Sequence, residues 1–166
     1  MLQPVRRRTW APRGRTPILR AWDRRDRLSA TCALTISPRR RRLSLYFRWQ
    51  EGNVSAEDLV AFVRQLHRHL GTPITLVWDR SGPHRKAARL LLAGRPRWLH
   101  IEWLPPYAPE LNPAEQVWNH AKSVDLANAP ADDLAQLTTS VRASFARQRQ
   151  RQSLLSAYFQ HAQLKI

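Results

Sequence analysis

The chain has 166 residues, of which 43% are hydrophobic and 8% aromatic, a composition that builds one globular domain and excludes a disordered chain. Its formal net charge of +16 at pH 7 favours a polyanionic partner, and nucleic acid is the natural one. No run approaches the ~20 apolar residues of a membrane span, no signal peptide is recognisable, and the single cysteine, Cys32, excludes a disulfide framework and a cysteine zinc site. We therefore expect a soluble cytoplasmic protein with no membrane partner.

The positive charge is concentrated at the start of the chain. Residues 1–50 hold 14 of the 28 Lys and Arg but only two of the 12 acids, Asp23 and Asp26, which leaves this third with a net charge of +12. Prolines and a glycine break residues 1–26, which predicts an irregular basic arm with at most a short strand near 18–22. Arginine supplies most of the charge, and its guanidinium suits phosphate oxygens. The alternative is that many of these side chains are merely solvated.

Two β-strands are expected next, over Leu28–Ile36 and Leu43–Trp49, because both runs are rich in β-formers. The turn between them carries four consecutive arginines. The strands are predicted to pair as an antiparallel hairpin with a basic tip. The arm and this tip supply the residues that we expect to bind the phosphates of a nucleic acid: Arg6, Arg7, Arg8, Arg13, Arg15, Arg39, Arg40, Arg41 and Arg42.

The middle of the chain alternates helices and strands. Ser55 and Asp58 have capping-box spacing ahead of apolar residues at helical intervals, so a helix should begin there and end at Gly71. Ile74–Trp78 is a short apolar run of the kind found in fully buried strands. A helix and a strand are expected to follow, over His84–Ala93 and Leu99–Trp103.

The last third is predicted to be helical. Asn112 is a helix N-cap with Pro113 at the first helical position. A longer helix follows Pro130, and a final helix carries an apolar cluster at 154–159. The element order is that of an α/β protein. We expect three parts: a basic arm at 1–26, an α/β core at 27–125, and a C-terminal helical extension at 126–166.

Two carboxylates stand where open α/β proteins place their sites. Asp79 directly follows the apolar run 74–78, and the carboxyl ends of strands are the usual position of such sites. Glu115 lies in the first turn of the helix that Asn112 caps. Each has a structural alternative, Asp79 as a cap of the following helix and Glu115 as part of a capping box with Asn112. Carboxylates are the ligands that Mg²⁺ and Mn²⁺ prefer, so the pair is a candidate metal site.

The segment around Glu115 favours a functional role. Four prolines in the loop Leu104–Pro113 fix the path into the helix, which capping alone does not require. One helical face carries Glu115, Asn119 and Lys122 at i, i+4 and i+7, which aims a polar stripe and a cation in one direction. Another face is apolar and is expected to point to the core: Val117, Ala121 and Val124.

These segments resemble the catalytic domain of bacterial insertion-sequence transposases of the mariner superfamily. The resemblance runs from Arg6 onward and includes Arg8-Thr-Trp-Ala-Pro-Arg-Gly14, the Asp79 segment, and Leu104-Pro-Pro-Tyr-Ala-Pro-Glu-Leu-Asn-Pro113 with the Glu-Gln-Val-Trp-Asn and Lys122 that follow. It implies an RNase H-like mixed sheet flanked by helices. It also implies a DDE triad with Asp79 as the second acid and Glu115 as the third, 36 positions apart.

The implied function is metal-dependent DNA cleavage and strand transfer in DNA transposition. Asp79 and Glu115 would be the catalytic residues and would hold Mg²⁺ or Mn²⁺. Four residues are expected near the site, of which two match residues near the site of relatives (His84 and Asn112) and two share the Glu115 face (Asn119 and Lys122). DNA, as element ends and target, is the implied partner, with a homodimer for the intact transposase and a place at the bacterial nucleoid.

The first aspartate of the family's triad has no counterpart in this sequence. It lies on a first core strand upstream of the Arg-Thr-Trp-Ala-Pro segment, which here falls before Met1. We therefore expect a sheet without its first strand, no helix-turn-helix region, and a chain that is inactive alone. Asp23 and Asp26 are poor substitutes, because neither ends an apolar strand and both lie among arginines that would pair with them.

Two alternatives stay open. The first is a non-enzymatic DNA-binding remnant of a transposase, held on DNA by the arginine arm and the hairpin tip. The second is another RNase H-like nuclease such as a junction resolvase, to which the Pro-Pro-Tyr loop would be foreign. An apolar strand ending in Asp, encoded upstream in this or a neighbouring frame, would separate the transposase from the remnant.

Overall fold

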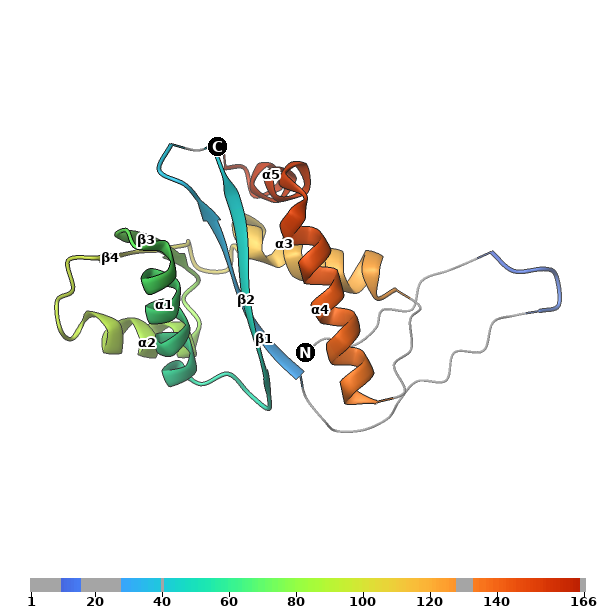
Figure 1. The fold of residues 1–166 in the computed structure, drawn as a ribbon, viewed down its shortest axis with the longest axis horizontal. Coiled ribbons are helices and arrows are strands. Elements are labelled where there is room, and N and C mark those ends of the chain that lie inside the picture. Colours follow the sequence, from blue (N-terminus) through green and yellow to red (C-terminus); the bar gives the residue numbers. More distant parts are fainter. Residues whose placement is uncertain (1–9, 16–27, 40, 128–132, 165–166) are drawn as a thin grey trace.

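The computed structural model describes residues 10–15, 28–39, 41–127 and 133–164. Helices and strands follow each other in the expected order (Figure 1). The strand expected near 18–22 lies outside the described residues. The elements are β1 Leu28–Ile36, β2 Leu43–Glu51, α1 Ala56–Leu70, β3 Ile74–Trp78, α2 Gly82–Leu92, β4 Leu99–Trp103, the 3-10 helix η1 Pro109–Leu111, α3 Pro113–His120, the π-helical segment η2 Ala121–Asp125, α4 Leu134–Gln150 and α5 Gln152–His161.

The predicted hairpin is confirmed. β1 and β2 pair antiparallel, with Ile36 opposite Leu43 at the tip and Leu28 opposite Glu51 at the base. The tip is held by Ser37, whose hydroxyl accepts hydrogen bonds from the N–H groups of Arg41 (3.2 Å) and Arg42 (3.1 Å). These hydrogen bonds hold the backbone of the tip, and the side chains of Arg39, Arg41 and Arg42 are exposed to solvent.

One hydrophobic core joins the hairpin to the C-terminal helices. One face of the hairpin packs against α3, α4 and α5, which lie together on its side in Figure 1. Phe145 of α4 is fully buried there, with ring contacts to Phe47 (5.4 Å), Trp49 (4.8 Å) and Trp118 (5.2 Å) between centroids. The cluster thus spans the hairpin, α3 and the two last helices.

A buried polar network fixes the segment that follows α3. Asp125 accepts hydrogen bonds from the Ser144 hydroxyl (2.6 Å) and lies 3.3 Å from the Arg147 guanidinium. Next to it, the Tyr158 hydroxyl donates to Gln148 (2.8 Å). Burial and the nearby Asp125 charge raise the pKa of Tyr158, so it stays a neutral donor. The network anchors the end of η2 to α4.

A second core lies between α1, α2 and the β3–β4 pair. The capping box predicted at Ser55 is formed, because its hydroxyl accepts from the Asp58 N–H (3.1 Å) and the Asp58 carboxylate accepts from the Ser55 N–H (2.9 Å). Gly71 ends α1 in a left-handed conformation, with φ of 65°. β3 and β4 pair in parallel, with Trp78 opposite Trp103. α1 and α2 lie side by side against this pair (Figure 1).

The prediction that β3 is fully buried is wrong. Burial alternates along the strand, and Val77 is 53% exposed. α1 and α2 cover one face of the β3–β4 pair, and the side chains of the other face meet solvent. A continuous apolar run therefore did not signal two covered faces here. The helix after β3 also starts two residues earlier than expected, at Gly82, with Pro83 in its first turn.

The strands form two separate sheets within the described part of the chain. β1 pairs with β2 alone and β3 with β4 alone, so each pair leaves free edges there. None of the described helices has the length and apolar character that a membrane span requires.

We expect these free strand edges to cause self-association of the isolated chain. Unpaired N–H and C=O groups on an edge template pairing with another chain, and a charged side chain on the strand suppresses it. Light scattering and gel filtration should show oligomers or aggregates, and Val77→Lys on β3 should reduce them. Val124→Lys is the matched control, because Val124 is 61% exposed but lies outside any strand. A monomer with a sharp two-state melt would contradict the expectation.

Candidate active site

Asp79 lies at the carboxyl end of the parallel pair. It directly follows Trp78, the last residue of β3, and the Leu104 N–H donates to the Trp78 carbonyl (2.8 Å) just beyond β4. The chain therefore leaves both strands at one edge, which is where the sequence predicted a site. The Asp79 side chain is 43% exposed, so a ligand from solvent reaches it.

The Asp79 carboxylate is held through one of its two oxygens. Oδ1 accepts from the Ser81 N–H (2.9 Å) and lies 2.5 Å from His84 Nδ1. Partial burial raises the pKa of Asp79, but the hydrogen bonds from Ser81 and His84 outweigh it and hold the pKa below its usual value. A hydrogen bond from the Ser81 side chain also contributes to this lowering of the pKa. The site thus offers an ionised carboxylate that is partly open to solvent.

His84 sets the orientation of Asp79. Its ring stacks on Trp78, with centroids 4.7 Å apart and planes at 8°, while Nδ1 meets the carboxylate. The alternative role of Asp79 as a helix cap is wrong, because Ser81 is the N-cap of α2 and no side chain caps it. Asp79 instead forms a turn with Ser81, and the turn positions it ahead of the helix.

Glu115 is not used as a capping residue. Asn112 is the N-cap of α3 as predicted, but its side chain accepts from the Ala114 N–H (3.1 Å). The Asn112 N–H, which a capping box would give to Glu115, donates to the Pro109 carbonyl instead (3.0 Å). The capping-box alternative is therefore wrong, and the Glu115 carboxylate is left for another role.

Glu115 lies beside the hairpin. α3 packs against β1, and burial raises the pKa of the Cys32 thiol on β1 to about 12, with the Glu115 carboxylate adding to the rise. Cys32 therefore stays protonated and unreactive at neutral pH. The loop that delivers Glu115 contains the 3-10 helix η1 and Tyr107, which is fully exposed and has φ of 58°. A non-glycine residue in this conformation is uncommon, and nothing in the sequence signalled it.

The two candidate ligands come from different parts of the fold. Asp79 follows β3 beside the second core, and Glu115 lies in the first turn of α3, which packs on the hairpin. Within the described ranges, no three His, Cys, Asp or Glu residues gather closely enough to hold a metal ion. The donor chemistry of Asp79 and Glu115 fits Mg²⁺, which prefers carboxylate oxygens. Asp23 and Asp26 lie outside the described residues.

The face expected to carry Glu115, Asn119 and Lys122 is not a continuous α-helix. α3 ends at His120, and Lys122 lies in the π-helical turn that follows, so the spacing i, i+7 no longer fixes its direction. Asn119 is exposed and Lys122 is half-buried. The same turn corrects a core prediction. Val117 and Ala121 are fully buried as expected, but Val124 is 61% exposed because the wider turn rotates it outward.

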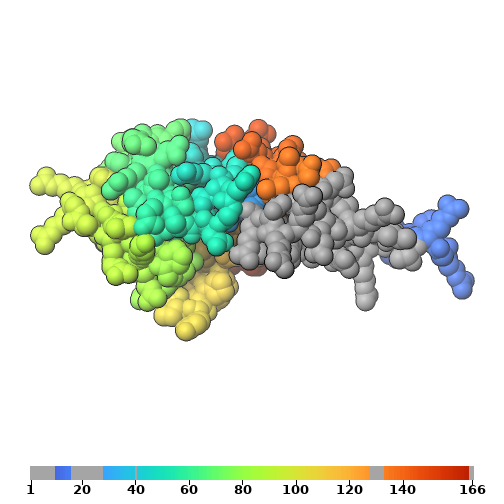
Figure 2. Space-filling model, turned by 90° about the horizontal axis from the view of Figure 1, so that it is seen from below, coloured from blue at the N-terminus to red at the C-terminus, as the bar shows by residue number. Residues whose placement is uncertain are grey.

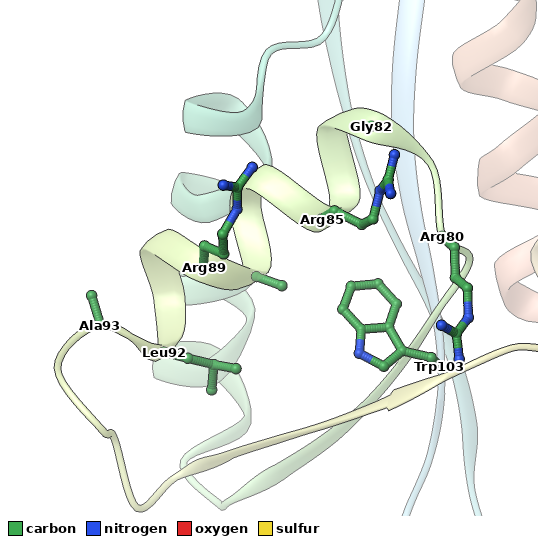
Figure 3. A pocket seen from close by; sticks show the side chains of 8 residues that line it. Arg80, Gly82, Arg85, Arg89, Leu92, Ala93 and Trp103 are labelled. Carbon is green, nitrogen blue, oxygen red and sulfur yellow. The ribbon is translucent and has the colours of Figure 1, made fainter.

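The described arginines of the arm and tip are all exposed, as a phosphate-binding role requires: Arg13, Arg15, Arg39, Arg41 and Arg42. Arg6, Arg7, Arg8 and Arg40 lie outside the described residues. Residues 10–15 lie at the end of the molecule opposite α2 (Figure 2). A third basic surface, on α2 beside Asp79, was not predicted from the sequence because it combines residues from α2 and β4 (Figure 3).

Comparison with known proteins identifies the family. A family model described as DDE superfamily endonuclease matches residues 1–138, so the chain belongs to this family. No curated protein matches the sequence. The crystal structure of the Mos1 strand transfer complex matches with a TM-score of 0.57 and 15% identity, over 98% of this chain and 47% of that one. The chain thus spans about half of the Mos1 chain. The predicted membership of the DDE endonuclease family and the RNase H-like α/β fold are confirmed.

Proposed function

We propose that this chain is the catalytic domain of a bacterial DDE transposase of the mariner superfamily, which cleaves DNA at the ends of a mobile element and joins the freed end to a target. One observation carries the proposal. In a chain of the DDE endonuclease family, Asp79 directly follows a parallel strand and is an ionised carboxylate partly open to solvent. The likeness to a chain of a strand transfer complex supports the same choice at the level of the fold.

Asp79 and Glu115 are the residues that would hold a divalent cation, Mg²⁺ or Mn²⁺. Their oxygens are the hard donors that these ions prefer, and neither carboxylate is taken up by a helix cap. When bound, the metal would supply activation of the attacking oxygen and stabilisation of the leaving oxygen at the phosphodiester. The chain's own part is to hold the two carboxylates ionised and correctly oriented.

His84 is the positioning residue in this proposal. Its ring stacks on Trp78 and its Nδ1 contacts Oδ1, and together these contacts fix the orientation of the Asp79 carboxylate. Asn112 orients Glu115 indirectly, because it caps the helix that carries it. We also propose that Asn119 and Lys122, beyond Glu115 on α3 and η2, contact the DNA near the reacting phosphate, and that the intact enzyme acts as a homodimer on nucleoid DNA.

The 166-residue chain is proposed to be inactive alone. The DDE triad implied by the resemblance has three carboxylates, and Asp79 and Glu115 would supply two of them. The test compares this chain with a version extended upstream through a strand that ends in Asp and through a DNA-recognition region. We expect Mg²⁺- or Mn²⁺-dependent cleavage of an element end by the extended protein alone. If neither protein cleaves, a second candidate function is favoured, that of a non-enzymatic DNA-binding remnant. The exposed Arg39, Arg41 and Arg42 of the tip support this candidate.

Binding to duplex DNA is expected to be largely independent of sequence and steeply dependent on salt. If six phosphates are neutralised, the slope of log K against log salt should be about −5. Replacing Arg39, Arg41 and Arg42 by alanine should make it less steep by about 3, because each phosphate contact contributes about 0.9. Replacing the exposed Arg64 of α1 is the control and should leave the slope nearly unchanged. A flat response in a fluorescence titration, or strong preference for one short sequence, would count against this.

A further inference from the structure

A groove of about 900 Å³ lies between α2 and the end of β4 (Figure 3). Three arginines line it, Arg80 from the loop before α2 and Arg85 and Arg89 from successive turns of α2. In this view the indole ring of Trp103, the last residue of β4, lies below Arg85 and beside Arg80. The groove therefore combines positive charge with an aromatic surface.

The three arginines have no acidic partner within the part of the chain that the structure describes. Their neighbour Lys86 on α2, in contrast, pairs with Glu57 of α1 at 2.8 Å. All three arginines are exposed. Arg80 gives its Nε–H to the Leu104 carbonyl (3.2 Å), which fixes its side chain across the groove. A surface that gathers three unneutralised guanidinium groups is suited to phosphates, to which arginine donates paired hydrogen bonds.

We propose that this groove binds an unpaired DNA strand, with phosphates on Arg80, Arg85 and Arg89 and a base stacked on Trp103. Grooves for single strands combine a basic path for the backbone with aromatic rings for the bases. In a duplex the base faces are already stacked on each other and cannot use the ring. The half-buried Trp103, which lines the groove together with the arginines, thus favours a single strand over a duplex.

The position of the groove connects it to the candidate catalytic carboxylate. Arg80 is the residue after Asp79, and α2 carries both His84 and the groove arginines. A DNA strand bound along the groove would therefore reach Asp79. The inference rests on the proposed function for its choice of DNA and adds that nucleotides next to the reacting phosphodiester are unpaired when bound.

The test measures binding of the full chain to a labelled oligo-dT of about 20 nucleotides and to a duplex of the same length, by fluorescence anisotropy. The double variant Arg85→Ala/Arg89→Ala should weaken oligo-dT binding and make its salt slope less steep by about 1.4, at about 0.7 per phosphate contact on a single strand. Its matched control is Arg64→Ala/Arg68→Ala, which removes two exposed arginines at the same spacing from α1 and should change neither.

Trp103 is tested separately. Trp103→Ala should weaken oligo-dT binding about 5- to 100-fold and duplex binding far less, whereas Trp103→Phe keeps a stacking ring and should retain most of the affinity. If Trp103→Ala does not fold, the Phe variant and the arginine pair decide. Unchanged oligo-dT binding in the arginine double variant, with duplex binding still dependent on the hairpin tip, would overturn the groove and leave the proposed function standing. If the unmodified chain binds no DNA at all, both the groove proposal and the proposed function are overturned.

Discussion

Asp79→Ala and Glu115→Ala are each expected to abolish metal-dependent DNA cleavage in the protein extended upstream by an aspartate-bearing strand. Each substitution removes one of the three carboxylates that would hold the metal in the proposed mechanism. A misplacement of about 1 Å already costs on the order of 10²-fold in rate, so the loss of a ligand should cost at least this much. Gel assays of end cleavage with Mg²⁺ and Mn²⁺ measure the effect, and DNA binding should stay nearly intact.

Glu102→Ala is the matched control for these variants. Glu102 is an exposed acid on β4, close in sequence to the same sheet edge, and its contact is with His100 on its own strand (2.7 Å). Its removal should leave cleavage unchanged. The opposite finding, metal-dependent nicking by the 166-residue chain that disappears on Asp23→Ala or Asp26→Ala, would show that acids within the chain complete the site and that the proposed inactivity is wrong.

Local chemistry accounts for the elements that the sequence predicted. The helix start at Ser55 and the cap at Asn112 depend on hydrogen bonds within a few residues, so a pattern of four letters suffices to place them. The bounds of β1 and β4 follow from runs of β-formers between turn residues. The position of Asp79 is equally local, because an acid directly after an apolar strand comes to lie at the sheet edge.

Features that depend on the rest of the fold escaped prediction. An apolar run such as β3 looks the same whether helices cover one face or both, and only the position of α1 and α2 decides that Val77 is exposed. The π-helical segment ends at Asp125, which accepts a hydrogen bond from Ser144, 19 residues away in sequence. Whether Glu115 takes part in a capping box depends on the acceptor of the Asn112 N–H. Here that acceptor is the carbonyl of Pro109 in the proline-rich loop. The groove at Trp103 likewise needs β4 to lie beside α2.

Phe145→Ala is expected to lower the free energy of unfolding by about 3–5 kcal/mol, the usual cost of emptying a buried phenylalanine site. The side chain is fully buried and meets three aromatic rings, from β2 and α3. Urea denaturation followed by circular dichroism measures the change. Leu90→Ala on α2 is the control, because Leu90 is 42% exposed and should cost much less.

The same variant tests how the parts of the chain depend on one another. Phe145 belongs to α4, beyond the core boundary expected at residue 125, yet it contacts the hairpin and α3, the helix that carries Glu115. If one cooperative unit includes them all, Phe145→Ala should loosen the Glu115 helix as well as α4, and amide exchange of α3 should accelerate in proportion to the lost stability. A loss below about 1 kcal/mol, with α3 unaffected, would instead mean that the C-terminal helices are an independent extension whose packing does not position Glu115.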